Sequence, residues 1–244
     1  MNDLRGAWDA EADHWVRFAR TPGHDRSFWD FGLPIFLALL PSPSGLCVDI
    51  GCGEGRLPRL LRSEGYEVVG IDGSPNLVHR AMEAERGPYV VADAARLSLR
   101  DGCATLALAY MTLHDFDDLD GAVREIGRVL RSGGRFCFAL VHPMSSAGAF
   151  ELRSANARFV ISGSYLEPRR YREDSDRGGI RMTFHSMHRP LEAYTRALEN
   201  AGLLIETLRE PPIAETFLRD DPAEARWLRL PLYLLGRAVK PGTP

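Results

Sequence analysis

The residues that point most directly to chemistry are an aspartate and the glycines that follow it. Asp49 belongs to the apolar run 46–50, which leads into Gly51, Cys52, Gly53 and Gly55. An apolar run bounded by glycines is typical of a buried parallel strand, and the glycines let the backbone turn tightly and approach a ligand closely. A carboxylate at this turn would repel a pyrophosphate but attract a cation. The stretch therefore predicts a site for a positively charged, nucleotide-like cofactor.

A second acid lies at the distance expected for a ribose contact. Asp72 and Gly73 end the β-rich run 67–71, and Asp72 comes 21 residues after Gly51. An acid at the end of the second strand, about 20 residues beyond the glycines, is placed to accept hydrogen bonds from ribose hydroxyls.

The glycine pattern departs from the dinucleotide fingerprint G-x-G-x-x-G, because its third glycine is Gly55 and position 56 is an arginine. An acid followed by G-C-G-E-G resembles the first motif of class I S-adenosylmethionine-dependent methyltransferases. Their cofactor carries an ammonium and a sulfonium. On the motif alone, a purely structural strand-to-helix turn stays open.

The resemblance continues over residues 46–142. The runs 89–92 and 105–111 follow as further strands, and the glycine pair before the aromatic run 135–141 is similar to the ubiquinone/menaquinone-type subgroup. The resemblance implies that Asp93 contacts the adenine amino group while the Ala94 N–H reaches a ring nitrogen, although Asp93 could also cap the next helix. Tyr110 and Met111 end the fourth strand, whose carboxyl end should face the same crevice.

His114 is the candidate general base. In the family, the segment 112–116 lies where cofactor and acceptor meet, and an imidazole titrates near neutral pH. The alternative is that His114 only packs against the cofactor or shapes the acceptor pocket. The family needs no conserved catalytic residue.

No metal site is expected. The acids in 115–120 precede a helix, where capping and the helix dipole favour them. His185 and His188 lie three apart on a predicted strand and so point to opposite faces. The four cysteines include no C-x-x-C pair, which favours a reduced, cytoplasmic protein.

The chain divides into four parts of one domain. Residues 1–45 are a helical cap, with helices over 7–20 and 30–40, from which Trp15 or His24 could reach the site or simply pack. Residues 46–142 are the cofactor-binding core. Residues 143–189 are an inserted lid or acceptor region, in which 158–165 and 180–188 form a ribbon joined by a long charged connection. A solvated loop is the alternative there. Residues 190–244 hold a helix and the strands 203–209 and 226–239.

Composition excludes some partners. The 244 residues are 45% hydrophobic and 26% charged, with a net charge of −3, so no global basic field favours nucleic acid. No stretch has the length of a membrane-spanning helix, and the acidic N-terminal sequence lacks the apolar core of a signal peptide. The oligomeric state, monomer or homodimer, stays open.

The expected fold is α/β: a Rossmann-like, doubly wound, seven-stranded sheet with an antiparallel last strand, an N-terminal helical cap and a lid inserted after strand five. The expected function is methyl transfer from S-adenosyl-L-methionine to a small molecule, with S-adenosyl-L-homocysteine as product. The aromatic cap and the insertion favour a bulky metabolite as acceptor, such as an aromatic natural product, over protein or nucleic acid. An NAD(P)-dependent oxidoreductase and a non-catalytic S-adenosylmethionine-binding regulator are the alternatives.

Overall fold

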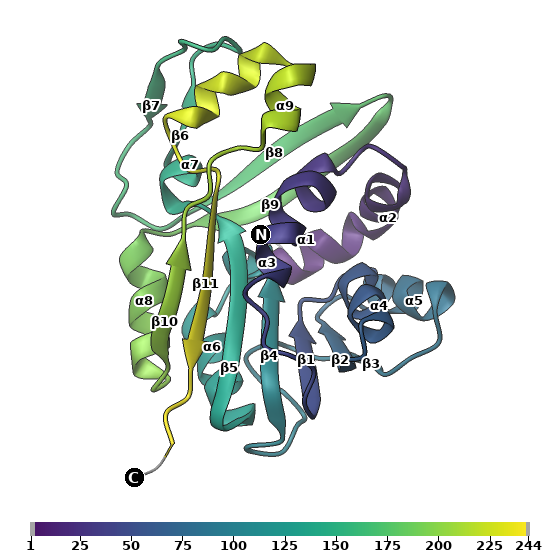
Figure 1. Cartoon of the computed structure of the whole chain (residues 1–244). Helices are drawn as coiled ribbons and strands as arrows, with labels where there is room; N and C mark the ends of the chain where they lie inside the picture. The colour runs from purple at the N-terminus through teal and green to yellow at the C-terminus, as the bar shows by residue number, and fades with distance from the viewer. Residues whose placement is uncertain (1–2, 243–244) are drawn as a thin grey trace.

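A seven-stranded sheet forms the centre of the computed structural model, which describes residues 3–242. Its strands are β1 (Leu46–Ile50), β2 (Glu67–Asp72), β3 (Tyr89–Val91), β4 (Ala104–Tyr110), β5 (Leu130–Val141), β10 (Leu204–Arg209) and β11 (Tyr233–Val239). They lie side by side in the order β10-β11-β5-β4-β1-β2-β3 (Figure 1). β11 runs antiparallel to both of its neighbours, and the other neighbouring pairs are parallel. The predicted fold class, including the antiparallel last strand, is confirmed.

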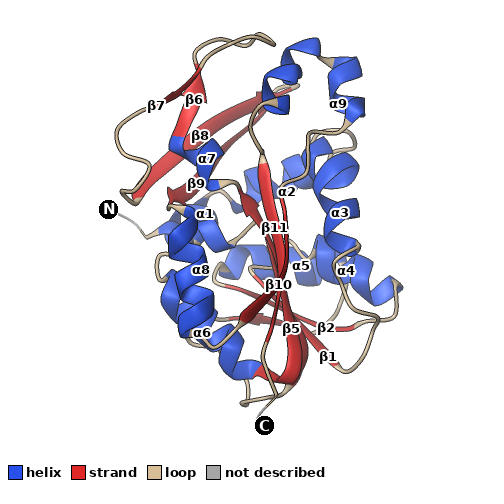
Figure 2. Cartoon of the chain, turned by 60° about the vertical axis from the view of Figure 1, so that its left-hand side comes forward, coloured by secondary structure: helices blue, strands red, loops and turns tan. Residues whose placement is uncertain are grey.

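Helices cover both faces of this sheet (Figure 2). One face packs against α6 (Leu119–Val129) and α8 (Leu191–Asn200), and the other against η1 (Ser27–Gly32), α3 (Leu33–Leu37) and α4 (Arg56–Ser63). The helix α5 (Pro75–Ala84) packs beside β2 and β3. Along β5, Phe136 and Phe138 face the first group while Cys137 and Ala139 face the second. Burial on both faces explains why the central strands are apolar throughout.

The N-terminal cap differs in detail from its prediction. The expected helix over 7–20 is two helices, α1 (Leu4–Ala10) and α2 (Ala12–Arg20), which meet at Glu11. The Asp3 carboxylate accepts a hydrogen bond from the Gly6 N–H at 2.8 Å, so the first helix begins earlier than expected. In place of one helix over 30–40, η1 and α3 follow each other.

The strand pairing predicted for the insertion is wrong. It comprises α7 (Pro143–Ala147), β6 (Gly148–Phe150), β7 (Phe159–Ile161), β8 (Arg169–Arg177) and β9 (Ile180–His188). β9 pairs with β8, and β7 pairs with β6, so the charged connection is itself a strand. Gly178 and Gly179 both have positive φ, as a two-residue hairpin turn requires.

The last predicted strand is wrong over its first half. The segment before β11 contains α9 (Glu215–Asp220) and η3 (Pro222–Leu228), and β11 begins only at Tyr233. Asp221 caps η3 by accepting a hydrogen bond from the Ala223 N–H, and Pro231 has no N–H to donate to a ladder. With the insertion, α9 and η3 lie above the carboxyl ends of the strands (Figure 1). Within residues 3–242, none of the helices is long and apolar enough to cross a membrane.

Candidate active site

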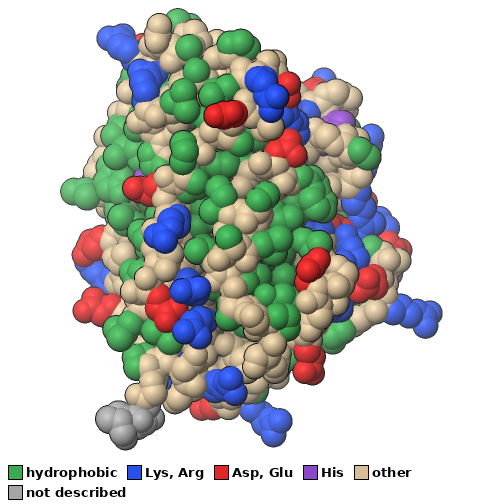
Figure 3. All heavy atoms as spheres, in the orientation of Figure 1, with side chains coloured by type: hydrophobic (Ala, Val, Ile, Leu, Met, Phe, Trp, Pro, Cys, Tyr) green, Lys and Arg blue, Asp and Glu red, His purple; other side chains and the backbone are tan. Residues whose placement is uncertain are grey.

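A cavity of about 1390 Å³ lies where the carboxyl ends of β1, β2 and β4 meet the cap and the insertion. Small-molecule pockets usually enclose about 300–1,000 Å³. A cavity of this size can hold a cofactor and an acceptor together. In the space-filling view, hydrophobic side chains gather on the face where the inserted elements meet the sheet (Figure 3).

The glycine loop is held against β2 by backbone hydrogen bonds. The N–H groups of Gly51 and Cys52 both donate to the Ile71 carbonyl, at 2.7 and 3.0 Å. Gly51 has a φ of +77°, and a Cβ there would overlap the Thr112 side chain. The loop therefore needs glycine at this position for its conformation and for its close approach to the end of β4.

Asp49 is buried below this loop, with 1% of its surface exposed. Its Oδ1 atom has no hydrogen-bond partner within the described part of the chain. Burial first, and then the charge of Asp72, raise the pKa of Asp49 to about 8. An unpartnered buried carboxylate oxygen in a cavity fits a ligand that brings an ammonium group.

The Asp72 carboxylate is oriented by the backbone around it. Its Oδ2 accepts a hydrogen bond from the Gly53 N–H and its Oδ1 from the Ser74 N–H, both at 2.8 Å. Burial raises the pKa of Asp72, and these hydrogen bonds partly oppose the rise. Each oxygen keeps a second acceptor site, so the carboxylate can still accept hydrogen bonds from a diol.

Twelve of the thirteen predicted site residues line the cavity: Trp15, Asp49, Gly51, Cys52, Gly53, Asp72, Gly73, Asp93, Ala94, Tyr110, Met111 and His114. Asp93 accepts a hydrogen bond from the Ala95 N–H at 2.9 Å, but this bond closes a turn, and no helix follows for Asp93 to cap. Met111 has a φ of +55° and is the one non-glycine residue with positive φ between residues 3 and 242. Such strain gathers at functional sites.

Gly55 is the predicted site residue that does not line the cavity. Its φ is +81°, and a Cβ there would lie 2.7 Å from the Tyr89 hydroxyl and 2.9 Å from the Ala81 Cβ. This glycine serves the packing of the loop against α5 and β3. His24 also lies elsewhere, with its Nε2 3.0 Å from the Arg177 carbonyl at the tip of the hairpin. Trp15, in contrast, covers the loop, with its Nε1 3.4 Å from where a Gly53 Cβ would lie.

His114 is neutral where the structure places it. It is 5% exposed, and its Nδ1 has no hydrogen-bond partner in the part of the chain that the structure describes. Burial, followed by the positive charge of Arg189, lowers the pKa of His114 to about 3. An imidazole with that pKa is a weak base at neutral pH, so this environment favours the packing or pocket-shaping alternative.

The acids that follow His114 have different partners. Asp118 caps α6 by accepting a hydrogen bond from the Gly121 N–H, as predicted. Asp117 instead accepts from the Leu4 N–H and from Arg170, and Asp115 from the Ser186 hydroxyl. Across the described range, no three His, Cys, Asp or Glu side chains gather in a way that could hold a metal ion.

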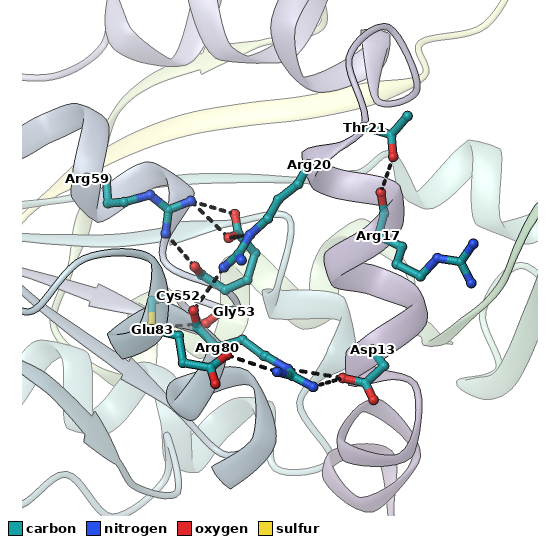
Figure 4. Close-up of polar contacts among 10 residues, drawn as sticks. Asp13, Arg17, Arg20, Thr21, Cys52, Gly53, Arg59, Arg80 and Glu83 are labelled. Carbon is teal, nitrogen blue, oxygen red and sulfur yellow. Dashed lines mark hydrogen bonds and ion pairs between the residues drawn. The ribbon is translucent and has the colours of Figure 1, made fainter.

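Sequence reasoning missed the ionic contacts that join the cap to the loop. Glu54 follows Gly53 and is 1% exposed, and its carboxylate pairs with Arg20 of α2 at 2.7 Å and Arg59 of α4 at 2.9 Å. Figure 4 shows both arginines converging on the loop beside Gly53, with the Arg80–Asp13 ion pair nearby. A glutamate between two glycines of a buried loop was the available signal. The cap and the loop are thus mechanically linked.

The far wall of the cavity was also missed. It is aromatic and comes from the insertion, from the segment before β11 and from the first residue of β11, through Phe150, Phe217, Trp227 and Tyr233. The Phe150 and Trp227 rings pack edge to face, with centroids 4.9 Å apart. The role of Trp227 in the cavity wall was not predicted, because the strand predicted over 226–239 placed Trp227 in the sheet.

Comparisons with known proteins agree with this geometry. The methyltransferase domain family matches residues 48–138. Malonyl-[acyl-carrier protein] O-methyltransferase of Pectobacterium atrosepticum is 35% identical over 105 residues, which are 42% of this chain and 42% of that protein. An uncharacterized methyltransferase of Schizosaccharomyces pombe is 29% identical over 197 residues, covering 77% of this chain and 68% of that protein. The chain spans between 37% and 42% of the length of the first curated relatives it matches.

A solved structure extends the similarity beyond the core. The S-adenosylmethionine-dependent methyltransferase from Mesorhizobium loti superposes with a TM-score of 0.69 at 27% sequence identity, over 86% of this chain and 99% of that one. The sheet order with its antiparallel β11, the acid–glycine loop and the matched domain agree with one another. Residues 48–138 are therefore a methyltransferase domain, and the fold around them is that of S-adenosylmethionine-dependent methyltransferases.

Proposed function

We propose that this protein transfers a methyl group from S-adenosylmethionine to a small-molecule acceptor and releases S-adenosylhomocysteine. The observation that carries the proposal is the buried Asp49 carboxylate beside a glycine loop in the cavity, with one oxygen that no described residue contacts through a hydrogen bond. The carboxylate attracts a cofactor that carries an ammonium and a sulfonium, and it repels a pyrophosphate. The sulfonium methyl is already activated, so the protein has chiefly to align the acceptor and exclude water.

The proposed contacts divide the cofactor into three parts. Asp49 and the backbone of 51–53 hold the methionine part, and Asp72 with Gly73 holds the ribose. Asp93 and Ala94 hold the adenine. Trp15, Tyr110 and Met111 enclose the cofactor from the cap and from the end of β4, and His114 lies beside the point of transfer.

The proposed acceptor is a bulky metabolite, in keeping with an aromatic natural product. The support is the aromatic far wall and a cavity volume above that of an ordinary cofactor pocket. The proposed organisation is one domain, with 1–45 as cap, 46–142 as cofactor-binding core, 143–189 as acceptor region and 190–244 as closing helix and strands. We also propose a cytoplasmic protein that acts as a monomer or homodimer.

Titration calorimetry with S-adenosylhomocysteine and with NADH tests the cofactor. Micromolar or tighter binding of S-adenosylhomocysteine is expected, with no binding of NADH. Tight NADH binding without S-adenosylhomocysteine binding would instead support an oxidoreductase. Turnover of labelled S-adenosylmethionine against a metabolite panel then separates an enzyme from a regulator that only binds the cofactor.

A further inference from the structure

Asp115 joins the core to the inserted hairpin inside the cavity. It ends η2 (Leu113–Asp115), the short turn after β4, and its Oδ1 accepts a hydrogen bond from the Ser186 hydroxyl at 2.7 Å. Ser186 belongs to β9 and is 4% exposed. Both residues line the cavity. The insertion therefore does more than cover the site, because it supplies a partner to a carboxylate within it.

A phenol extends this pair. Tyr171 lies opposite Ser186 in the β8–β9 register and also lines the cavity. Burial, and then the nearby charge of Asp115, raise the pKa of Tyr171 above its usual range, while Ser186 opposes that rise. A carboxylate, a hydroxyl and a neutral phenol are thus contiguous on one wall. Such a set can hold one polar group of a ligand in a defined orientation.

The charged neighbours of Asp115 come from three directions. On its own turn, the His114 Nε2 lies 3.6 Å from the Asp115 Oδ1. Arg189, just after β9, donates to the carbonyls of Phe116 and Asp117 but does not line the cavity. Asp72 contributes a like charge from β2.

On this wall of the cavity, the Asp115 carboxylate binds a proton more readily than the His114 imidazole does. Burial raises the pKa of Asp115 well above its usual value; Asp72 adds to the rise, while Ser186 and Arg189 oppose it. The pKa of His114 falls to about 3 in the same environment. A carboxyl whose pKa is raised accepts a proton more readily than an imidazole whose pKa is lowered to about 3, which favours Asp115 over His114 as the base.

We propose that Asp115, held by Ser186 and Tyr171 of the inserted hairpin, binds the reacting group of the acceptor and takes its proton. The acceptor then reacts through a hydroxyl or an amine N–H, not through a carboxylate. This inference rests on the methyl-transfer function proposed above. Asp115 is the catalytic residue in it, and Ser186 and Tyr171 are positioning residues.

The step balances without any further reactant. A lone pair of the acceptor oxygen or nitrogen forms a bond to the sulfonium methyl carbon, the carbon–sulfur bond breaks, and its electron pair stays on the sulfur of S-adenosylhomocysteine. The proton of the acceptor passes to the Asp115 carboxylate and then to solvent. An ionised carboxylate acceptor has no proton to give, and Asp72 and Asp115 would repel it.

Matched probes test the acceptor class. The full chain is incubated with tritium-labelled S-adenosylmethionine and 2-naphthol, 2-naphthylamine or 2-naphthoate, together with phenol, aniline and benzoate. Methyl ethers and methylamines withstand alkali, whereas methyl esters release volatile methanol. Alkali-stable product from the hydroxyl or amine probes is expected. Alkali-labile product from the carboxylates overturns the inference.

Variants test the role of Asp115. In the wild type, kcat should rise with pH, because the ionised form of a carboxyl with a raised pKa appears only above that pKa. Asp115→Asn should lower kcat at least tenfold and remove this rise. Its affinity for S-adenosylhomocysteine should stay within twofold. Ser186→Ala should change the pH at which kcat rises, because the substitution removes a hydrogen bond that favours the ionised form of Asp115. Asp120→Asn, an exposed acid outside the cavity, is the matched control and should behave as wild type.

Each failure has its own meaning. If Asp115→Asn keeps both the rate and the pH profile, Asp115 is not the base. If the wild type binds S-adenosylhomocysteine but methylates none of the hydroxyl or amine probes, the proposed acceptor class is overturned. If it does not bind S-adenosylhomocysteine, the methyl-transfer function itself falls.

Discussion

Replacing Asp49 with asparagine removes one charge from the cofactor loop and leaves the shape of the side chain. Asp49 is 1% exposed and its Oδ1 has no hydrogen-bond partner among residues 3–242, so a bound ammonium would meet it with little screening. A hydrogen bond to a charged group contributes about 1.5–3 kcal/mol. Asp49→Asn should therefore weaken S-adenosylmethionine binding by about 10- to 150-fold, measured by titration calorimetry.

The pKa of Asp49 adds a pH signature. The pKa is about 8 in the unliganded protein, and a cation beside the carboxylate lowers it, so binding selects the ionised form. Wild-type affinity should then rise about tenfold between pH 6 and 7, with about 0.9 proton released per cofactor at pH 7. Calorimetry in buffers of different ionisation enthalpy measures that release. The asparagine variant should show neither effect.

Stability supplies an independent check. A carboxyl whose pKa is raised on folding binds more protons in the folded than in the unfolded state, so it makes stability fall as pH rises from about 4 to about 8. Unliganded Asp49→Asn should lack this loss and have the higher melting temperature at pH 8.5. Asp101→Asn, an exposed acid paired with Arg128, should alter neither binding nor the pH trend. Unchanged affinity in a folded Asp49→Asn protein, together with pH-independent wild-type binding, would refute the reasoning.

Three further substitutions test other parts of the site. Gly51→Ala should destabilise the fold by several kcal/mol in urea unfolding, because the new Cβ would overlap the Thr112 side chain. Gly65→Ala is the control: Gly65 has φ +88° and no atom within 4 Å of its Cβ position, so this variant should lose only about 1–2 kcal/mol. Equal losses in the two variants would rule out the clash with the end of β4. Arg20→Ala should lower the free energy of unfolding by about 1–3 kcal/mol, less than the loss of a fully buried pair, because Arg20 is 36% exposed. It should also speed S-adenosylhomocysteine dissociation in stopped flow. Arg196→Ala, which removes an exposed pair on one helix, is the control and should change neither property. His114→Ala should keep near-normal cofactor affinity and the wild-type rise of kcat with pH, because burial and Arg189 lower the pKa of His114 to about 3. Loss of that rise in the variant would show that His114 is the base.

The core could be predicted because its signals are local. Asp49 and the glycines of its loop stand next to one another in the chain, and Asp72 follows at the distance set by one helix and one strand. The strands β1, β4 and β5 are buried on both faces, so each is a short apolar run that can be recognised without knowing its neighbours. The roles assigned to these residues stay predictions.

The elements above the sheet could not be predicted in the same way. β8 is mostly exposed and rich in arginine and acids, so it has no apolar periodicity and resembles a solvated connection. Its pairing with β9 depends on the turn at Gly178 and Gly179, which brings distant charged residues into register. Trp227 likewise owes its place in the cavity wall to a proline-started helical turn, η3, and not to a strand pattern.

His114 shows why the chemistry of the acceptor half is harder to predict than its location. The sequence placed this imidazole correctly at the end of β4, yet its protonation depends on burial and on Arg189, which lies 75 residues further along the chain. Burial raises the pKa of the neighbouring Asp115, while the Ser186 hydroxyl of β9 and the charge of Arg189 partly oppose that rise. The hairpin therefore decides which of two adjacent side chains can act as a base. An insertion of different sequence on the same core would change the acceptor chemistry while leaving the cofactor loop intact.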